Sequence, residues 1–440
     1  MAKEKKRASS GKATKLGERL RALREKRGIS LREMERRSGI NSGYLSQLER
    51  DEIAQPTPSV LNRIAGPYGE PVEVLMEWAG YISADPRGLS PNRKRALNFI
   101  PDDISERELE ALRAVLDALR GEDSSANSLL RPHRYDMELL VNEKEQVKAT
   151  AKALLRTMEA ERTSEPVDLE QAMVVAKLVE AGEIELDLAQ KRKLRERFGG
   201  LVDWALKNLQ GIVNLDSNEV FVQPGMHELR RRFVLGHEIG HAALEDHRVV
   251  FAHLDDDKRL RPEFADRLEC QANQFSIELL AKGDRFCREF DASRPSIENL
   301  SLLSGRYRIS LQAAARRIAE DSQQDCAVAI AWRAQKGSGP LYLSGYRLWT
   351  SASFERRFGW RTLGHPAEEV KAALRSVVTD GDLQPFLAAE SGGTEVELEI
   401  DSLDARYSVL VLLVPPRKLR IRALKPRLGG SRARSGAAAG

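Results

Sequence analysis

Two histidines spaced one helical turn apart, with a glutamate between them, are the residues of this chain best suited to chemistry. His237, Glu238 and His241 form the pattern His-Glu-x-x-His within the segment RRFVLGHEIGHAALEDH. On a helix this spacing puts both imidazoles on one face, where they can share a zinc ion, and Glu238 can polarise a water molecule. The apolar neighbours and Gly240 indicate a buried helix, in which two histidines without a ligand would be costly.

A catalytic zinc takes three protein ligands and leaves one position open, so a third ligand is needed. His247 is the first candidate, but Leu244 stands where a glycine would have to break the helix. On a continuing helix, His247 would lie roughly 240° around from His241 and face away. That class of site also needs a downstream methionine, and none follows Met226. We therefore exclude a three-histidine site.

Glu269 is the better third ligand. It lies on a helix opened by Pro262, at the margin of an apolar face made of Phe264, Leu268, Phe275 and Leu279. Asn273, one turn later, is suited to bond a ligand imidazole from outside the metal shell. Two histidines and a glutamate, with a further glutamate as base, form the thermolysin-like arrangement. The alternative for Glu269 is a solvated or salt-bridged helix position.

The segments RRFVLGHEIGHAALE, ECQANQFSIELL and RYRISLQAAARRI resemble the ImmA/IrrE metallopeptidase family, over about residues 140–320. In that family the paired histidines and the glutamate of the E-x-x-A-N-x-F segment bind zinc, and its members cleave XRE-type repressors. The resemblance implies Zn²⁺ as the cofactor, His237, His241 and Glu269 as its ligands, and Glu238 as the general base. It also implies a role in switching on stress-response or mobile-element genes.

The N-terminal segment predicts a bundle of five short helices. Ser30 and Glu33 form a capping box that opens the second helix, and Gly39 separates it from a third helix, INSGYLSQLER. Two short helices joined by a glycine-containing turn are the helix-turn-helix arrangement, whose second helix enters the major groove of DNA. The segment resembles the XRE-type (lambda-repressor-like) helix-turn-helix family from Leu16 to Tyr81. Pro67 departs from the family pattern and is expected to shorten the fourth helix.

The third helix supplies the expected base contacts. If Leu45 and Leu48 face the core, the outward polar positions are Asn41, Ser42, Tyr44 and Gln47. Asparagine and glutamine can bind adenine through two hydrogen bonds. The flanking residues suited to bind DNA phosphates are Arg32, Arg36, Arg37 and Arg50. The alternative is a helical bundle that binds only protein.

Charge is distributed unevenly along the chain, although the formal net charge is only +4. Residues 1–50 contain 15 Lys and Arg against 6 Glu, and residues 415–440 contain 8 Lys and Arg and no acid. Basic ends on an acidic body indicate nucleic-acid contact, or solvated tails at 1–15 and 417–440. Three cysteines without a C-x-x-C pattern, and no apolar run long enough for a membrane span, indicate a cytoplasmic, nucleoid-associated protein.

The expected fold is multidomain and mainly α. It comprises a five-helix bundle (16–82), a linker with one isolated amphipathic helix (83–134), a central α+β zincin-like domain (135–325) and a C-terminal α+β extension (326–416). Within the central domain, EIELDL predicts a strand and GIVNLDSNEVFVQPG a hairpin. A helix is expected near 366–377, and the role of the C-terminal extension stays open between ligand sensing, dimerisation and plain structural extension.

Two functions fit these features. The first is a zinc endopeptidase tethered to double-stranded DNA by its own helix-turn-helix, acting on an XRE-type repressor protein. The second is a transcription factor whose zincin-like domain is a sensor or scaffold without turnover. Glu238 favours the first, because a purely structural domain does not need it. A homodimer is expected in either case, since a single half-site gives limited specificity.

Overall fold

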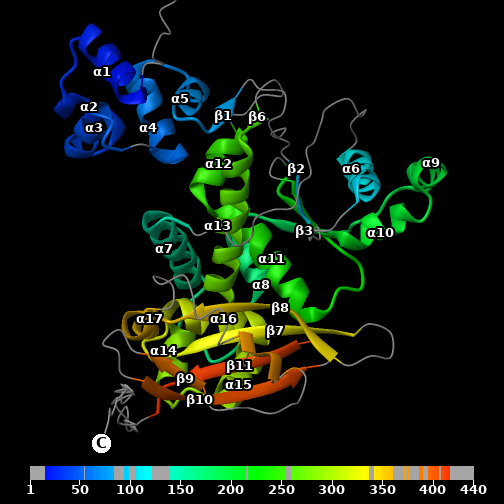
Figure 1. Ribbon diagram of the computed structural model, residues 1–440. Coiled ribbons are helices and arrows are strands. Elements are labelled where there is room, and N and C mark those ends of the chain that lie inside the picture. Colours follow the sequence, from blue (N-terminus) through cyan, green and yellow to red (C-terminus); the bar gives the residue numbers. More distant parts are fainter. Residues whose placement is uncertain are drawn as a thin grey trace, which may run out of the picture. The chain divides into compact units, whose positions relative to one another are not determined.

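The computed structural model separates into two compact units, Met1–Gly283 with Arg306–Ile309 and Asp284–Gly305 with Ser310–Gly440 (Figure 1). The residues described are 15–53, 55–83, 94–98, 105–120, 139–214, 217–252, 259–335, 341–359, most of 371–378, 386–389, 395–405 and 408–416. The basic tails, apart from Lys15, and much of the linker lie outside these ranges. Among the described residues, no helix is both long and apolar enough to cross a membrane.

The predicted N-terminal bundle is confirmed. Its helices are α1 (Leu16–Lys26), α2 (Leu31–Ser38), α3 (Ser42–Glu49), α4 (Pro58–Tyr68) and α5 (Val72–Trp78). The Oγ of Ser30 caps α2 by accepting a hydrogen bond from the Glu33 amide at 3.2 Å. Gly39, at φ 67°, ends that helix in the left-handed conformation. Leu45 and Leu48 of α3 are fully buried, as its pattern predicted.

The expected shortening of the fourth helix is wrong, because α4 passes through Pro67 and ends at Tyr68. A proline in the last helical turn removes one backbone hydrogen bond, which is a limited loss there. The ring of Tyr68 is fully buried, so its packing offsets that loss. Gly69, at φ 70°, then ends the helix.

A buried carboxylate ties three helices of the bundle together. Glu49 at the end of α3 accepts hydrogen bonds from Arg24 Nε at 2.7 Å and Nη2 at 2.8 Å, and from the Tyr68 hydroxyl at 2.8 Å. The Glu49 side chain is only 4% exposed. Burial and the bond to Glu49 raise the pKa of Tyr68, so the phenol stays protonated and donates. The spacing of α1, α3 and α4 therefore depends on this trio.

The bundle packs onto two helices from much later in the chain, α12 (Glu245–Ala252) and α13 (Pro262–Leu280). They share one apolar cluster with the bundle, to which the later helices contribute Val249, Val250, Phe251, Phe264, Ala265 and Leu268. Strand β1 (Ile82–Ser83) pairs antiparallel with β6 (Arg259–Leu260). The buried Asp246 carboxylate accepts hydrogen bonds from the Ser59 amide at 2.8 Å and from Gln146 Nε2 at 2.9 Å.

The central region holds a four-stranded sheet with helices beside it. Its strands follow the order β2 (Lys94–Asn98), β4 (Leu209–Asn214), β5 (Glu219–Val222) and β3 (Val179–Glu183). The helices include α7 (Val141–Thr157), α8 (Leu169–Val175), α11 (Glu228–Ala243) and α13. The pairing of β4 with β5 confirms the predicted hairpin.

The prediction of a strand at EIELDL, residues 183–188, is wrong, because β3 ends at Glu183. Asp187 instead caps α9 (Leu188–Phe198) by accepting a hydrogen bond from the Gln190 amide at 2.8 Å. The amphipathic helix of the linker, α6 (Glu106–Arg120), is also not isolated. It shares an apolar cluster with α9 and with α10 (Leu201–Asn208). An apolar stripe predicts burial, but not which partner provides it.

The second unit is α+β, as expected for the C-terminal extension at 326–416, but it begins at Asp284 and so also takes in residues expected in the central domain. Its five-stranded sheet has the order β8 (Leu341–Thr350), β7 (Ala327–Gln335), β11 (Ser408–Val414), β10 (Glu395–Ala405) and β9 (Phe386–Ala389). Its helices are α14 (Arg285–Asp291), α15 (Ile297–Tyr307), α16 (Leu311–Asp321) and α17 (Ala352–Phe358). Of the helix expected near 366–377, residues 371, 372 and 374–376 are described, and all of them are helical. Burial raises the pKa of Cys326 in this unit to about 12, so its thiol stays protonated.

Replacing Arg24 by alanine should loosen the bundle, because it leaves the Glu49 carboxylate buried without its guanidinium. Removing one partner of a buried ion pair costs about 3 kcal/mol or more. Backbone amides of α1 and α3 should therefore exchange with solvent on the order of 100-fold faster in the full chain. The matched control is Arg21→Ala, whose pair with Glu25 is exposed, and it should leave exchange unchanged. Equal exchange in the two variants would show that the trio does not hold the bundle.

Candidate metal centre and nucleic-acid interface

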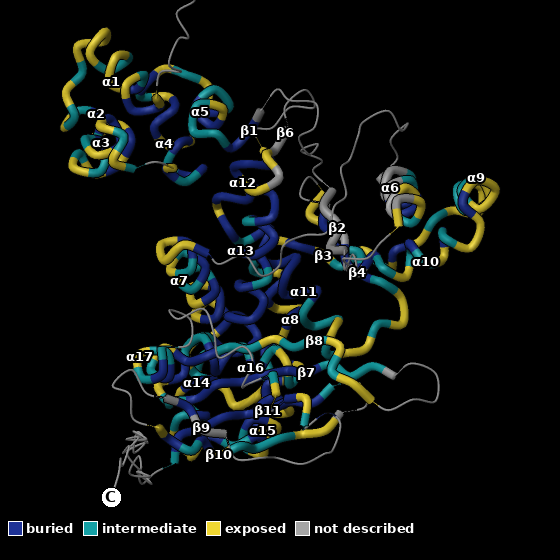
Figure 2. Tube along the Cα trace, viewed as in Figure 1, coloured by how far each residue is buried: buried dark blue, intermediate teal, exposed yellow. Residues whose placement is uncertain are grey.

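The helices α11 and α13 approach each other closely because two glycines of α11 face α13. A Cβ at Gly236 would lie 2.6 Å from the Ser276 Oγ, and one at Gly240 would lie 3.1 Å from the Phe275 ring. Ser276 also donates a hydrogen bond of 2.8 Å to the Phe233 carbonyl on α11. Both helices are buried along most of the contact (Figure 2). This packing sets the distance between side chains that the two helices direct toward each other.

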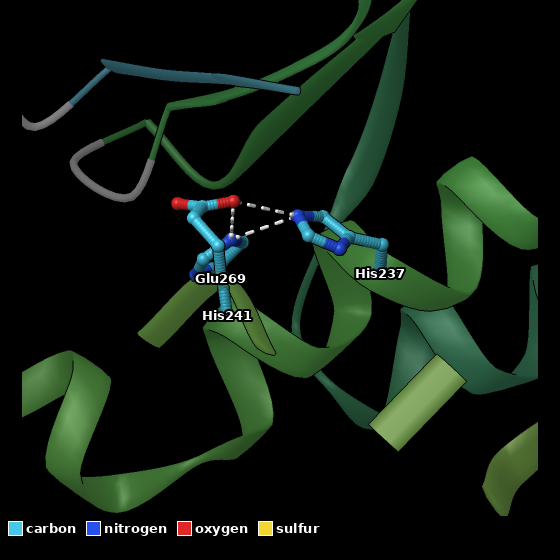
Figure 3. Close-up of side chains that lie close together, drawn as sticks. All are labelled: His237, His241 and Glu269. Atoms are coloured by element: carbon cyan, nitrogen blue, oxygen red, sulfur yellow. Dashed lines mark hydrogen bonds and ion pairs between the residues drawn. The ribbon is translucent and has the colours of Figure 1, made fainter. Parts of the chain in front are cut away.

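His237, His241 and Glu269 come together at this contact, as Figure 3 shows. The two imidazole Nε2 atoms are 3.0 Å apart, and Glu269 Oε2 lies 3.3 Å from His237 Nε2 and 3.6 Å from His241 Nε2. In tetrahedral zinc sites, ligand atoms about 2.0–2.2 Å from the metal lie roughly 3.3 Å from one another. All three side chains are buried. The donor types and their spacing therefore fit one zinc ion.

Asn273 lies where the sequence led us to expect it, behind a histidine of the cluster. Its Oδ1 is 2.9 Å from Nδ1 of His237. With a proton on Nδ1 the imidazole donates to the amide oxygen, and its Nε2 lone pair points toward Glu269 and His241. A bond of this kind fixes both the tautomer and the ring orientation of a metal-binding histidine.

His247 does not face away, and the expectation that it would is wrong. Helix α11 ends at Ala243, Leu244 is extended with ψ 119°, and the chain restarts as α12. This break turns the fully buried His247 toward His241, with their Nδ1 atoms 2.9 Å apart. His247 contacts the side of the His241 ring opposite the cluster. It is therefore a neighbour of a candidate ligand, and the exclusion of a three-histidine site is unaffected.

His247 belongs to a chain of hydrogen bonds with one consistent direction. If His241 offers Nε2 to a metal, its Nδ1–H must donate, so His247 Nδ1 accepts. His247 Nε2–H then donates to the Gln271 Oε1 at 2.9 Å, and Gln271 Nε2 donates to Glu143 Oε1 at 3.3 Å. Arg267 Nε lies 3.5 Å from the same Glu143 oxygen. The spacing of α12 and α13 thus orients the His241 ring.

Glu238 lies beside the cluster, between α11 and the sheet. Its side chain is buried, and the neighbouring strand β4 carries Gly211 at the point of contact. A Cβ at Gly211 would lie 2.5 Å from Val234 Cγ1 and 2.6 Å from Glu238 Oε1, so a larger residue would force these buried side chains to shift. The sequence showed the importance of Glu238, but nothing in its pattern pointed to Gly211.

The candidate DNA-binding residues differ in their exposure to solvent. Gln47, Asn41 and Arg32 are exposed, and Asn41 also caps α3 by accepting a hydrogen bond from the Gly43 amide at 2.8 Å. Tyr44, expected on the outer face, is instead half-buried against the apolar cluster that the bundle shares with α12 and α13. Ser42 is also half-buried, and its amide donates to Glu35 at 3.1 Å.

Three of the candidate phosphate-binding arginines, Arg36, Arg37 and Arg50, are exposed but engaged in ion pairs. Arg36 and Arg37 both bond Glu33 at 2.7 Å, and Arg50 bonds Glu52 at 2.8 Å. Hydrogen bonds from Arg36 and Arg37 lower the pKa of Glu33 to about 2, so this carboxylate stays charged at physiological pH. The Glu33 cluster therefore presents one net positive charge to a phosphate, where the sequence suggested two.

Comparison with known proteins matches both regions of the chain. Residues 15–78 match a model described as a helix-turn-helix domain, and residues 185–319 match one described as an IrrE N-terminal-like domain, a peptidase family. The second match includes α9 to α15 and most of α16, and with them His237, Glu238, His241 and Glu269.

Two curated relatives from Bacillus subtilis (strain 168) resemble the N-terminal region. The HTH-type transcriptional repressor RghR is 36% identical over 66 residues, which are 15% of this chain and 49% of the relative. The HTH-type transcriptional regulator RghRB is 34% identical over 70 residues, which are 16% of this chain and 50% of the relative. The chain thus spans about half the length of the curated relatives that it matches.

A solved structure of a Mycobacterium tuberculosis transcriptional regulator aligns with 71% of this chain and 81% of its own, at 12% identity and a TM-score of 0.36. The two domain matches agree with the architecture described above. The chain therefore joins an XRE-like helix-turn-helix domain to an IrrE N-terminal-like domain of a peptidase family.

Proposed function

We propose that this chain is a DNA-binding, cytoplasmic transcriptional regulator that carries a zinc-dependent endopeptidase. Its substrate is an XRE-type repressor protein, and cleavage derepresses the genes that the repressor controls, such as stress-response or mobile-element genes. The observation that carries this proposal is the buried cluster of His237, His241 and Glu269. Glu238 lies on α11, the helix that carries the two histidines. The helix-turn-helix domain on the same chain supports the transcriptional role.

In this proposal His237 and His241 would hold zinc through Nε2, and Glu269 would hold it through a carboxylate oxygen. Zinc, when bound, polarises a peptide carbonyl and makes water a stronger acid. Asn273 Oδ1 accepts a hydrogen bond from His237 Nδ1–H, and His247 Nδ1 accepts one from His241 Nδ1–H. These two bonds orient the imidazole rings. The protein contributes a dry cluster of fixed geometry, held by the contact of α11 with α13.

Glu238 is the proposed general base. Its carboxylate accepts a proton from the attacking water and can deliver that proton to the leaving amine. Burial between α11 and β4 removes bulk water from around the carboxylate, which strengthens its interaction with developing positive charge.

For DNA, Gln47 and Asn41 are the proposed base-contacting residues, with Arg32, Arg36, Arg37 and Arg50 at phosphates. Ser42 and Tyr44 have less free surface, and Tyr44 belongs partly to the contact with the catalytic region. A homodimer would place two α3 helices on successive major grooves and so double the number of bases contacted.

The second candidate is a transcription factor whose metal-binding domain senses or supports without cleaving. The contact between the bundle and the metal-binding region favours it. Asp246 accepts from the Ser59 amide of the bundle, and the adjacent His247 bonds His241. A change at the metal cluster would therefore reach the DNA-binding bundle through two neighbouring residues of α12.

Zinc binding should distinguish ligands from supporting residues. His237→Ala should abolish stoichiometric zinc binding, because it removes a ligand. His247→Ala should lower zinc affinity about 10- to 100-fold, since it removes only the acceptor that orients His241. The measurement is competition with a chromophoric chelator. Unchanged affinity in His247→Ala would show that its contact with His241 does not support the site.

DNA binding should separate base contacts from phosphate contacts. On a site selected from random duplexes, Gln47→Ala should lower affinity about 10-fold and relax specificity at one position, with little effect on random DNA. Arg37→Ala should weaken binding to both and reduce the salt slope by about one. Fluorescence anisotropy at several salt concentrations measures both. Equal losses on both DNAs in the two variants would contradict a base contact by Gln47.

Glu238→Gln should separate the two candidate functions, because the amide keeps the shape but cannot accept the proton. Cleavage of a co-expressed XRE-type repressor should fall about 10²- to 10⁴-fold. Zinc content and DNA affinity should match those of the unsubstituted chain, since Glu238 is not a proposed ligand. Normal gene induction in Glu238→Gln cells, together with lost induction in His237→Ala cells, would favour the sensor.

A further inference from the structure

The linker strand β2 occupies the edge of the sheet next to the metal cluster. β4 pairs with β5 along one side and with β2, running antiparallel, along the other. In this register Leu97 lies opposite Gly211, and Ala96 lies opposite Ile212. Gly211 is the residue whose backbone runs against Glu238. The backbone of Leu97 is therefore paired with the part of β4 nearest the proposed base.

An extended peptide that reaches the metal cluster needs backbone partners close to Glu238. The outer edge of β4 offers them, because strand addition satisfies the peptide's amides and carbonyls and fixes its direction. The opposite edge of β4 is already taken by β5. A substrate and β2 would thus compete for the same hydrogen-bonding groups.

We infer that β2 pairs with β4 at the place where the peptide substrate would pair, and that a substrate must displace β2 to be cleaved. This inference rests on the proposed peptidase function. The strand belongs to the segment between the DNA-binding bundle and the catalytic region, after β1, which pairs with β6 beside α13. The chain itself thus controls access to its metal cluster.

The pairing of β2 suits a displaceable cover. It is five residues long, and its register shifts between Leu97 and Asn98. Short, irregular edge strands contribute little stability by themselves. A segment attached to the same chain nevertheless competes at an effective concentration on the order of millimolar. An outside peptide is therefore disfavoured until the linker strand is released.

The test weakens β2 and measures binding of a peptide in its place. In full-length, zinc-loaded Glu238→Gln protein, Ala96 and Leu97 are both replaced by proline, which removes two adjacent amide donors, one of which faces β4. The matched control replaces both by valine, which favours a strand. The probe is a fluorescein-labelled peptide with the sequence of residues 92–100, NRKRALNFI, with a scrambled peptide as reference.

The proline variant should bind this peptide at least about 10-fold more tightly than the valine variant, and the scrambled peptide should not show the difference. Hydrogen exchange should show faster exchange of the Leu209–Asn214 amides in the proline variant, with α11 unchanged. Equal peptide affinity in the two variants, or no binding in either, overturns the inference. Zinc-dependent cleavage within residues 94–98 of the unsubstituted chain also overturns it, because β2 would then be a substrate.

Zinc content is measured in the same samples, so failure of the proposed function can be recognised separately. Protein that binds no zinc but still gains peptide affinity on β2 disruption would contradict the zinc peptidase and retain β2 as a cover of the β4 edge. If these samples bind zinc and the unsubstituted chain cleaves a repressor, but β2 disruption does not change peptide affinity, the peptidase is retained and the role of β2 as a cover is overturned.

Discussion

The close contact of α11 with α13 is the constraint on which the rest of the site depends. Gly236 and Gly240 leave no Cβ between the helices, so Ser276 and Phe275 pack directly against the α11 backbone. At a larger separation, Glu269 could not lie 3.3 Å from the His237 Nε2. The geometry of the candidate metal site thus depends on helix packing as much as on its three polar side chains.

Helix α13 also holds the DNA-binding bundle, together with α12. Residues of α12 and α13 complete the apolar cluster of α1 to α5, and Asp246 binds the first turn of α4 through the Ser59 amide. One residue later, His247 contacts His241. α12 therefore has a bundle-facing residue and a cluster-facing residue next to each other. This arrangement connects the helix-turn-helix bundle physically to the candidate metal site.

The sequence predicted those features that depend on local patterns. The spacing of the two histidines and the apolar face around Glu269 were sufficient to predict that His237, His241 and Glu269 lie together. The capping box at Ser30 predicted the start of α2. Three features could not be predicted. Leu244 breaks α11 without a glycine or proline, which reversed the expectation for His247. The burial of Tyr44 and the pairing of β2 with β4 depend on contacts between segments far apart in the chain.

The coordination of zinc by two imidazoles and the Glu269 carboxylate is the central claim. Zinc K-edge X-ray absorption of the stoichiometric complex tests it most directly. It should show a four-coordinate shell of nitrogen and oxygen at about 2.0 Å, with outer-shell scattering from two imidazoles. Glu269→Ala should change that shell. A zinc–sulfur distance near 2.3 Å, pointing to the neighbouring Cys270, or scattering from three imidazoles, would contradict the account.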